Sequence, residues 1–249
     1  MSLDGPGGGA GTEGHDMHIP DGFIEPPVAV AAGVVAVAGI AVAIKRAPTE
    51  LDERRAPLAG LTAAFVFAAQ MLNFPVAAGT SGHLLGGLLA AVLVGPWTGV
   101  LCVSLVLLVQ ALVFADGGLS ALGLNIINMG FVGALGGYAV FRGIRAVLAA
   151  NRGTVVIAAG VAGGLSVVMA AVAFWVEYAI GGSVDVSLRA VFAAMVGTHT
   201  VIGIGEGLIT AATVGAVMAV RPDLVYGARD LIPVPTVAPS TEPARGAER

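Results

Sequence analysis

Long apolar stretches that carry almost no charge constrain the fold of this chain more than any other feature. Charged residues make up only 11% of the 249 residues, and hydrophobic residues make up 57%. The mean hydropathy is +0.91. A soluble domain carries about 25% charged residues. Because so few charges cannot cover a surface that faces water, the sequence predicts a membrane protein whose apolar stretches form transmembrane helices.

Seven helical segments can be placed along the chain by their apolar length, with boundaries good to about two to four residues. They are expected near residues 28–44, 58–72, 83–94, 97–115, 122–148, 154–178 and 188–219. A full span needs about 20 apolar residues, so the second and third segments need shelter from their neighbours. The predicted fold is therefore an all-α, polytopic membrane protein, a bundle of about seven transmembrane helices.

The basic residues indicate how this bundle is oriented. With the N-terminus outside, eleven of the twelve Lys and Arg residues fall in inner segments, and only Arg189 falls in an outer one. Inner loops of membrane proteins are enriched in Lys and Arg. We therefore expect the N-terminus outside and the C-terminus in the cytoplasm, with the cell (plasma) membrane as the location. Residues 1–16 are expected to be a flexible extension, 17–227 the membrane-embedded domain and 228–249 a disordered cytoplasmic tail.

Composition also disfavours several functional classes. The net charge of −4 and the scattered basic residues give no support for a nucleic-acid partner. The one cysteine, Cys102, allows neither a disulfide framework nor a cysteine metal site. The sequence holds no ATP-binding motif, so any ATP-driven work needs another subunit.

The dipeptide Met17–His18, just before the first apolar stretch, is the first candidate for chemistry. If the working chain starts at Met17, its α-amino group, the His18 amide nitrogen and the His18 imidazole can bind one metal ion through fused chelate rings. His83, predicted on the same side of the membrane, can supply a fourth nitrogen. Four nitrogens in a plane favour Ni(II) or Cu(II), and Co(II) can also bind. The alternative for His83 is a hydrogen-bonded histidine at a helix start.

Three further residues lie close to these ligands in the sequence. Asp21, in a Pro-Asp-Gly turn, either orients an imidazole or serves only the turn. Thr80 and Ser81 lie beside His83 and offer hydroxyl groups to the site or to the ion path.

Five polar residues of the later segments are also candidates. His199 and Glu206 are seven residues apart, so two helical turns place them on one face. His199 is a candidate for lining the ion path, whereas a structural or coupling role is expected for Glu206. Asn125 and Asn128 either support the metal ligands from behind or cap a helix, and capping is the favoured role. Glu177 is expected to be a solvated loop charge.

Five sequence blocks together resemble the CbiM/NikM family, the substrate-binding (S) components of cobalt and nickel energy-coupling factor (ECF) ABC transporters. The blocks are Met17–Phe23 (MHIPDGF), Asn73–Gly87 (NFPVAAGTSGHLLGG), Gly95–Trp97 (GPW), Asn125–Gly133 (NIINMGFVG) and His199–Gly207 (HTVIGIGEG). The resemblance runs from Met17 to about Arg221. The Met-His start and the Gly-Thr-Ser-Gly-His block are its most specific parts.

The resemblance implies a seven-helix subunit that captures Co²⁺ or Ni²⁺ from outside through Met17, His18 and His83. It implies a transmembrane coupling (T) subunit, two cytoplasmic ATPases and, in some systems, a small accessory membrane subunit as partners. The metal ion is the substrate, no resident cofactor is implied, and the chain is not an enzyme. Family members begin at the Met-His pair, so we expect translation to begin at Met17 or processing to expose it.

Two other function classes remain open. The first is a stand-alone divalent metal facilitator or secondary carrier, which the scarcity of acidic intramembrane residues disfavours. The second is a membrane enzyme that uses His199 and Glu206 as acid and base, for which the sequence offers no nucleophile. The planar set of nitrogens leans toward nickel, but the choice between cobalt and nickel also stays open.

Overall fold

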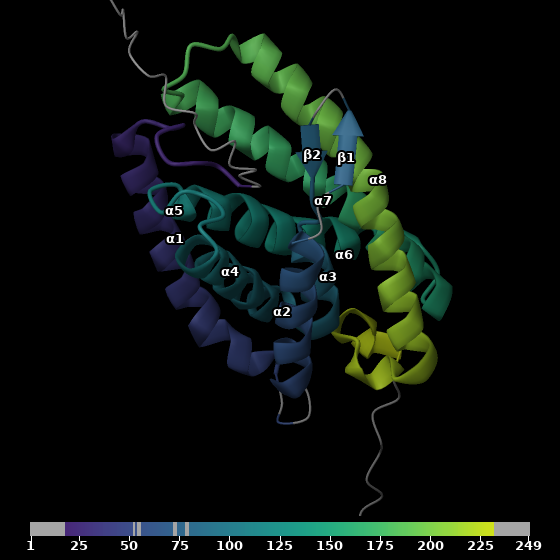
Figure 1. Cartoon of the computed structure of the whole chain (residues 1–249). Coiled ribbons are helices and arrows are strands. Elements are labelled where there is room, and N and C mark those ends of the chain that lie inside the picture. The colour runs from purple at the N-terminus through teal and green to yellow at the C-terminus, as the bar shows by residue number, and fades with distance from the viewer. Residues whose placement is uncertain (1–17, 52, 54–55, 72–73, 78–79, 232–249) are drawn as a thin grey trace, which may run out of the picture.

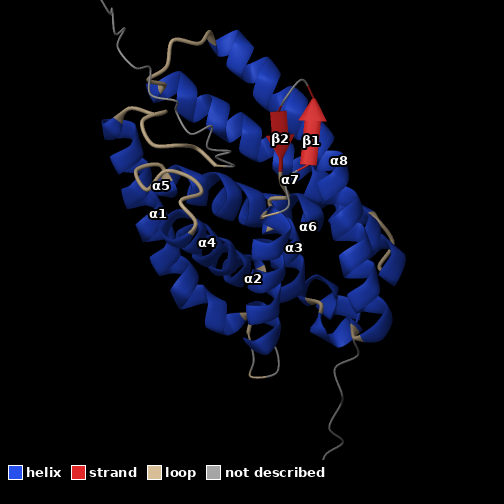
Figure 2. Cartoon of the chain, viewed as in Figure 1, coloured by secondary structure: helices blue, strands red, loops and turns tan. Residues whose placement is uncertain are grey.

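The computed structural model describes residues 18–231 except 52, 54–55, 72–73 and 78–79 (Figure 1). Met17, the predicted extension 1–16 and residues 232–249 of the predicted tail lie outside the described residues. Helices dominate the described chain, and a short two-stranded hairpin is the exception (Figure 2).

The helices follow the predicted segments in chain order. They are α1 (Pro26–Arg46), α2 (Ala56–Gln70), α3 (Gly87–Val94), α4 (Pro96–Val113), the continuous run of α5 (Leu122–Asn125), the π-helix η2 (Ile126–Gly136) and α6 (Gly137–Val147), then α7 (Arg152–Gly181) and α8 (Leu188–Val220). The 3-10 helices are η1 (Ala47–Thr49), η3 (Pro222–Leu224) and η4 (Tyr226–Leu231). The segment η4 crosses the boundary suggested at residue 227 and contains the buried residues Gly227 and Ala228.

Among the described residues, five helical stretches are long and apolar enough to cross a membrane. They are Pro26–Thr49, Pro96–Val113, Leu122–Val147, Arg152–Gly181 and Leu188–Val220. The helix Ala56–Gln70 is apolar but shorter. The predicted helical membrane character is thereby confirmed, whereas seven crossings and the orientation of the termini remain predictions.

The short helix α3 lies at the centre of the bundle. All of its eight residues are buried, and it packs against α2, α4, η2 and α7. Neighbours therefore cover its backbone, which lets a helix too short to span a bilayer persist inside one. The helix was expected to begin near residue 83 and begins at Gly87, at the limit of the two to four residues allowed for its boundary. Gly86 has a positive φ of 72°, which ends the extended chain and lets the helix begin at Gly87.

The hairpin is the part of the fold that the sequence reasoning missed. Strand β1 (Phe74–Ala77) pairs with β2 (Thr80–Gly82) in antiparallel register, with Phe74 opposite Gly82. It replaces the loop that was expected ahead of His83. Figure 1 shows it at the same end of the bundle as the start of α1.

Helices α7 and α8 approach closely at their glycines. A methyl group on Gly203 would lie 2.6 Å from the Gly164 carbonyl oxygen, and one on Gly207 would lie 2.7 Å from the Gly160 carbonyl oxygen. Small residues allow such backbone contact between membrane helices, where packing rather than water drives association. The long α7–α8 hairpin therefore depends on these positions.

Valine in place of Gly203 is expected to separate these helices, because its side chain meets backbone that cannot rotate away. Overpacking of this kind costs about 1–3 kcal/mol or more of folding free energy. Gly205→Val, on the same helix but with nothing within 4 Å of the added carbon, is the matched control. Thermal unfolding in detergent should show a clear loss of Tm for Gly203→Val only. A similar loss for both variants would attribute the effect to helix propensity.

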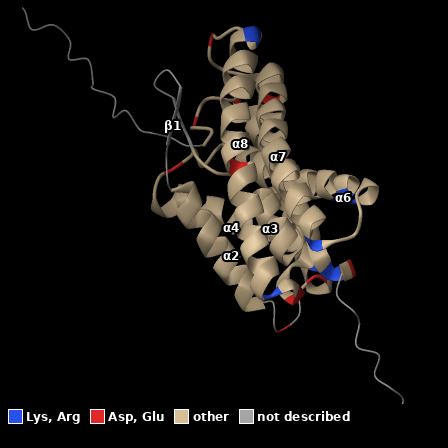
Figure 3. Ribbon diagram, turned by 90° about the vertical axis from the view of Figure 1, so that its right-hand side faces the viewer, with Lys and Arg blue, Asp and Glu red and all other residues tan. Residues whose placement is uncertain are grey.

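Charged side chains gather at the ends of the bundle (Figure 3). Most Lys and Arg residues lie at the end where α6 meets the C-terminal segment, and the long middle of the helices carries few charges. Glu206 is an exception, since it lies 2% exposed within α8. A buried carboxylate in such surroundings must be hydrogen-bonded, and its partners lead to the site described next.

Candidate metal centre

The structure brings the two predicted histidines together. His18 precedes α1 and His83 follows β2, yet their ring centroids lie 4.9 Å apart with the planes inclined by 51°. Each residue is only 8% exposed. Two imidazoles this close can bind the same ion.

His18 faces an aspartate that the sequence reasoning missed. Its Nδ1 lies 3.2 Å from Oδ1 of Asp116, which is 9% exposed in the loop after α4. Beyond this contact with Asp116, neither ring nitrogen of His18 has a hydrogen-bond partner among the described residues. Buried nitrogens are normally satisfied, so this imidazole has capacity for a further ligand. The local signal was weak, because an aspartate before two glycines is typical of any turn.

The loop after α4 approaches the chain around His18 very closely. A methyl group on Gly117, whose φ is +87°, would lie 2.7 Å from the His18 Cβ. Gly118 donates its N–H to the Ile19 carbonyl at 2.9 Å. Glycine is therefore required here both for the backbone conformation and for the close contact.

Asn125 holds the residue that follows His18. Its Oδ1 accepts the Ile19 N–H at 3.2 Å, and α5 has no side-chain cap. The prediction that Asn125 caps a helix is therefore wrong. A cap was expected because asparagine favours that position, but the partner came from a segment 106 positions away.

Asp21 contacts Ser120 rather than an imidazole. Its Oδ1 accepts from the Ser120 hydroxyl at 2.5 Å and from the Ser120 N–H at 2.8 Å. These hydrogen bonds hold the pKa of Asp21 below its usual range. Neither of the two roles that the sequence suggested describes these bonds, which join Asp21 to a residue 99 positions away. Asp21 fixes the His18 segment to the loop before α5.

The far end of this segment is fixed to the α7–α8 loop. Glu25 donates its N–H to the Gly181 carbonyl at 2.7 Å, and Ser183 donates its N–H to the Phe23 carbonyl at 3.1 Å. Residues 18–25 are thus bound on two sides, which limits where the His18 ring can move.

The turn after His83 is held by two buried side chains from different helices. Glu206 accepts the Leu85 N–H with Oε2 at 2.9 Å and the Gly86 N–H with Oε1 at 2.8 Å. Gln70, at the end of α2, donates to the Leu85 carbonyl at 2.7 Å. Hydrogen bonds to an ionised carboxylate are about twice as strong as neutral ones. The structural role expected for Glu206 therefore has a definite target, the turn that carries His83.

The hydrogen bond of His83 indicates which ring nitrogen can bind an ion. Its Nδ1 lies 2.9 Å from the Leu84 carbonyl oxygen. A carbonyl only accepts, so the proton belongs on Nδ1 and the lone pair on Nε2. Nε2 is accordingly the candidate ligand atom of His83.

A cavity of about 250 Å³ connects the two histidines with His199. The sulfur-bearing residues Met129 and Met195 also line it. His199 binds the Met195 carbonyl through Nδ1 at 2.8 Å, which places its lone pair on Nε2. His199 thus lines the same cavity as the paired histidines, and its role in an ion path stays a prediction.

His199 and Glu206 do not form the pair that an acid–base enzyme would need. Within the described part of the chain, the hydrogen bonds of Glu206 go to the turn after His83, and that of His199 goes to its own helix. Their common helical face therefore serves two separate contacts.

Two further predictions fail at the rim of the cavity. Glu177 is not a solvated loop charge, because α7 continues to Gly181 and carries this residue inside the helix. Its Oε2 accepts from Nδ2 of Asn128 at 2.8 Å. Asn128 is therefore no helix cap either, and lies in the π-helix η2. π-Helical turns are rare and often occur at functional sites.

The remaining predicted site residues are only partly described. Met17 lies outside the described residues, and for Thr80 and Ser81 the structure gives the backbone of β2 alone. The described residues contain no group of three or more His, Cys, Asp or Glu arranged to hold a metal.

Comparison with known proteins agrees with this geometry. Residues 18–224 match the family model for the CbiM cobalt uptake substrate-specific transmembrane region. The cobalt transport protein CbiM of Sorangium cellulosum is 36% identical over 223 residues, which cover 84% of this chain and 94% of that protein. The fused nickel transport protein NikMN of Rhodobacter capsulatus is 35% identical over 221 residues, covering 84% of this chain and 64% of that protein.

Solved structures show the same fold. The crystal structure of a transition metal transporter superposes with a TM-score of 0.74 at 30% sequence identity. The match covers 82% of this chain and 93% of that one. The fold, the paired histidines and the family match lead to one conclusion: this chain belongs to the CbiM family and is a membrane component for the uptake of cobalt or nickel.

Proposed function

We propose that this chain is the substrate-binding subunit of an energy-coupling factor ABC transporter in the cell membrane. It captures Co²⁺ or Ni²⁺ outside and passes the ion inward when partner subunits hydrolyse ATP. The observation that carries the proposal is the close approach of His18 and His83, 4.9 Å apart in a cavity within an apolar helical bundle.

The proposed ligands are four nitrogens. The Met17 α-amine and the His18 amide close one chelate ring, and the His18 amide and Nδ1 close a second. Nε2 of His83 completes the plane. Such a set suits Ni²⁺ and is open to Co²⁺, whereas Zn²⁺ prefers a tetrahedron.

Asp116 supplies the charge balance that this ligand set needs. The His18 amide binds only after losing its proton, so a divalent ion with this amide carries one net positive charge. Burying a net charge is costly unless an opposite charge lies close by. The Asp116 carboxylate lies 3.2 Å from Nδ1 of His18 and would neutralise the loaded site.

The ion path would lead from the paired histidines toward His199. His199, Met129 and Met195 line the same cavity as the two histidines. Imidazole and thioether groups are suitable temporary contacts for a borderline or soft metal ion. His199 would hold the ion only in passage, because no chelate ring forms there.

The partners in this proposal are a transmembrane coupling subunit and two cytoplasmic ATPases, with a small accessory membrane subunit in some systems. The relative from Rhodobacter capsulatus, a fused nickel transport protein NikMN, supports a role within a larger assembly. The chain catalyses no covalent step itself.

Uptake into sealed vesicles tests this function against a stand-alone carrier. Vesicles with this chain alone should bind Ni²⁺ or Co²⁺ without accumulating it. Accumulation should require the coupling subunit, both ATPases and ATP. Metal accumulation by the chain alone, driven by an ion gradient, would instead show a secondary carrier.

A further inference from the structure

A basic cavity of about 350 Å³ lies at the opposite end of the bundle from the histidines, where α6 meets η4. Its lining includes three arginines, two tyrosines and one aspartate: Tyr138, Arg142, Arg145, Tyr226, Arg229 and Asp230. Figure 3 shows this end as the place where basic residues gather. The lining thus combines positive charge with hydrogen-bond donors.

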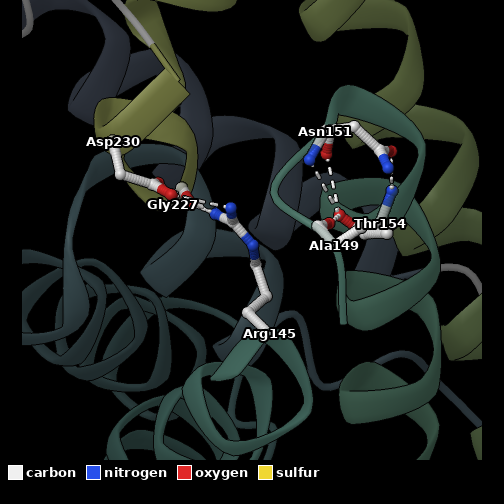
Figure 4. Close-up of polar contacts among 6 residues, drawn as sticks. All are labelled: Arg145, Ala149, Asn151, Thr154, Gly227 and Asp230. Carbon is white, nitrogen blue, oxygen red and sulfur yellow. Dashed lines mark hydrogen bonds and ion pairs between the residues drawn. The ribbon is translucent and has the colours of Figure 1, made fainter. Parts of the chain in front are cut away.

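Arg145 builds the wall of this cavity. Its guanidinium binds both carboxylate oxygens of Asp230, at 3.0 Å and 2.8 Å, and the Gly227 carbonyl at 2.7 Å (Figure 4). The side chain is only 9% exposed, and its Nε has no hydrogen-bond partner among the described residues. The one aspartate of the lining is therefore engaged by Arg145, so its charge is balanced within the wall of the cavity.

Arg229 and Arg142 face the cavity from the two elements that form it. The guanidinium carbon of Arg229 lies 3.8 Å from the ring centroid of Tyr226, and this arginine also donates to the Glu50 carbonyl. Arg142 is exposed and lies three residues before Arg145 on α6, so the two side chains share one helical face. The arginines of α6 and of η4 therefore line the same cavity.

We propose that this cavity binds a phosphate group, presented by the headgroup of an anionic membrane lipid. Guanidinium groups bind phosphate oxygens through paired, charge-assisted hydrogen bonds. Basic pockets between membrane helices are suited to anionic headgroups. The residues that follow the arginines of α6 favour a lipid over a soluble ion. Val147 is 82% exposed and Leu148 is 40% exposed, so both offer apolar surface to the acyl chains of a lipid.

Lipid binding to the purified full-length chain tests the proposal. Native mass spectrometry should show retention of phosphatidylglycerol over phosphatidylcholine, and phosphatidylglycerol should raise the Tm in detergent. Arg142→Gln should weaken this binding about tenfold, as expected for one lost hydrogen bond between charged groups. Arg142→Lys should retain most of it. Arg152→Gln, an exposed arginine of α7 outside the lining, is the matched control and should bind like the wild type.

Two other results would change or overturn the assignment to a lipid. A Tm increase with inorganic phosphate alone, lost in Arg142→Gln, would uphold the phosphate site and overturn its assignment to a lipid. Equal retention of the two lipids, or equal binding by Arg142→Gln and the wild type, would overturn the proposal. The Tm without lipid checks that Arg142→Gln is folded.

Discussion

Alanine in place of His83 is expected to weaken Ni²⁺ binding by more than about 100-fold in a protein that starts at Met17. Even a residue behind a metal ligand costs about 10- to 100-fold when it is replaced. The site would lose a direct ligand, since the His83 ring lies 4.9 Å from that of His18. The Met17–His18 chelate would then hold the ion with only three nitrogens.

Isothermal titration of the purified protein measures this effect. His199→Ala is the control, because His199 lines the same cavity but is not a proposed chelating ligand. The His199→Ala protein should still bind one ion per chain. Wild-type affinity in His83→Ala, or a greater loss in His199→Ala, would move the site deeper into the cavity.

Removal of the Glu206 carboxylate is expected to have the second largest effect. Glu206→Ala leaves the Leu85 and Gly86 N–H groups without acceptors inside an apolar bundle. Each orphaned buried donor costs about 1–3 kcal/mol. The turn after His83 would loosen, so both the Tm and the metal affinity should fall. Glu206→Gln keeps one acceptor oxygen, so its Tm and metal affinity should lie between those of Glu206→Ala and the wild type.

Spectroscopy separates a positioning role of Glu206 from a purely structural one. If Glu206 acts by placing His83, the Ni²⁺ absorption spectrum of Glu206→Ala should resemble that of His83→Ala at a temperature where both are folded. Gln70→Ala, which removes the contact to the Leu85 carbonyl instead, should leave both N–H bonds to Glu206 in place and change the spectrum less. A Glu206→Ala protein with a lower Tm but a wild-type spectrum would show a structural role only.

The sequence was sufficient to place the helical segments, because apolar length is a local property. The positions expected for α1, α4, α7 and α8 agree with the structure to within a few residues. The pairing of His18 with His83 also followed, since both lie beside the same predicted membrane face. A local signal thus identified the helices and the two principal side chains.

Contacts between distant segments could not be derived in the same way. Glu206 meets Leu85 across 121 positions, and nothing near either residue indicates the other. Asp116 reads as an ordinary turn residue until α4 and the chain before α1 are brought together. Asn125 and Asn128 have strong capping preferences, but tertiary partners compete successfully for their side chains.

The start of α3 shows the same limit. Leu84, Leu85 and Gly86 are apolar or small and fit a helical pattern, yet the backbone turns at Gly86 and the helix begins at Gly87. Glu206 and Gln70 hold the peptide groups there, so side chains from α8 and α2 decide where α3 begins.

The free amine at Met17 is the central requirement of the proposed site. Ni²⁺ titration of a chain that starts at Met17, beside the chain that starts at Met1, tests it directly. The shorter chain should bind one ion with the absorption band of a planar four-nitrogen site, and binding should weaken as pH falls because the amide and imidazoles regain protons. The longer chain should bind at least about 100-fold more weakly, as expected when a direct ligand is lost. Equal affinity and equal spectra, with residues 1–16 still attached by mass spectrometry, would contradict the account.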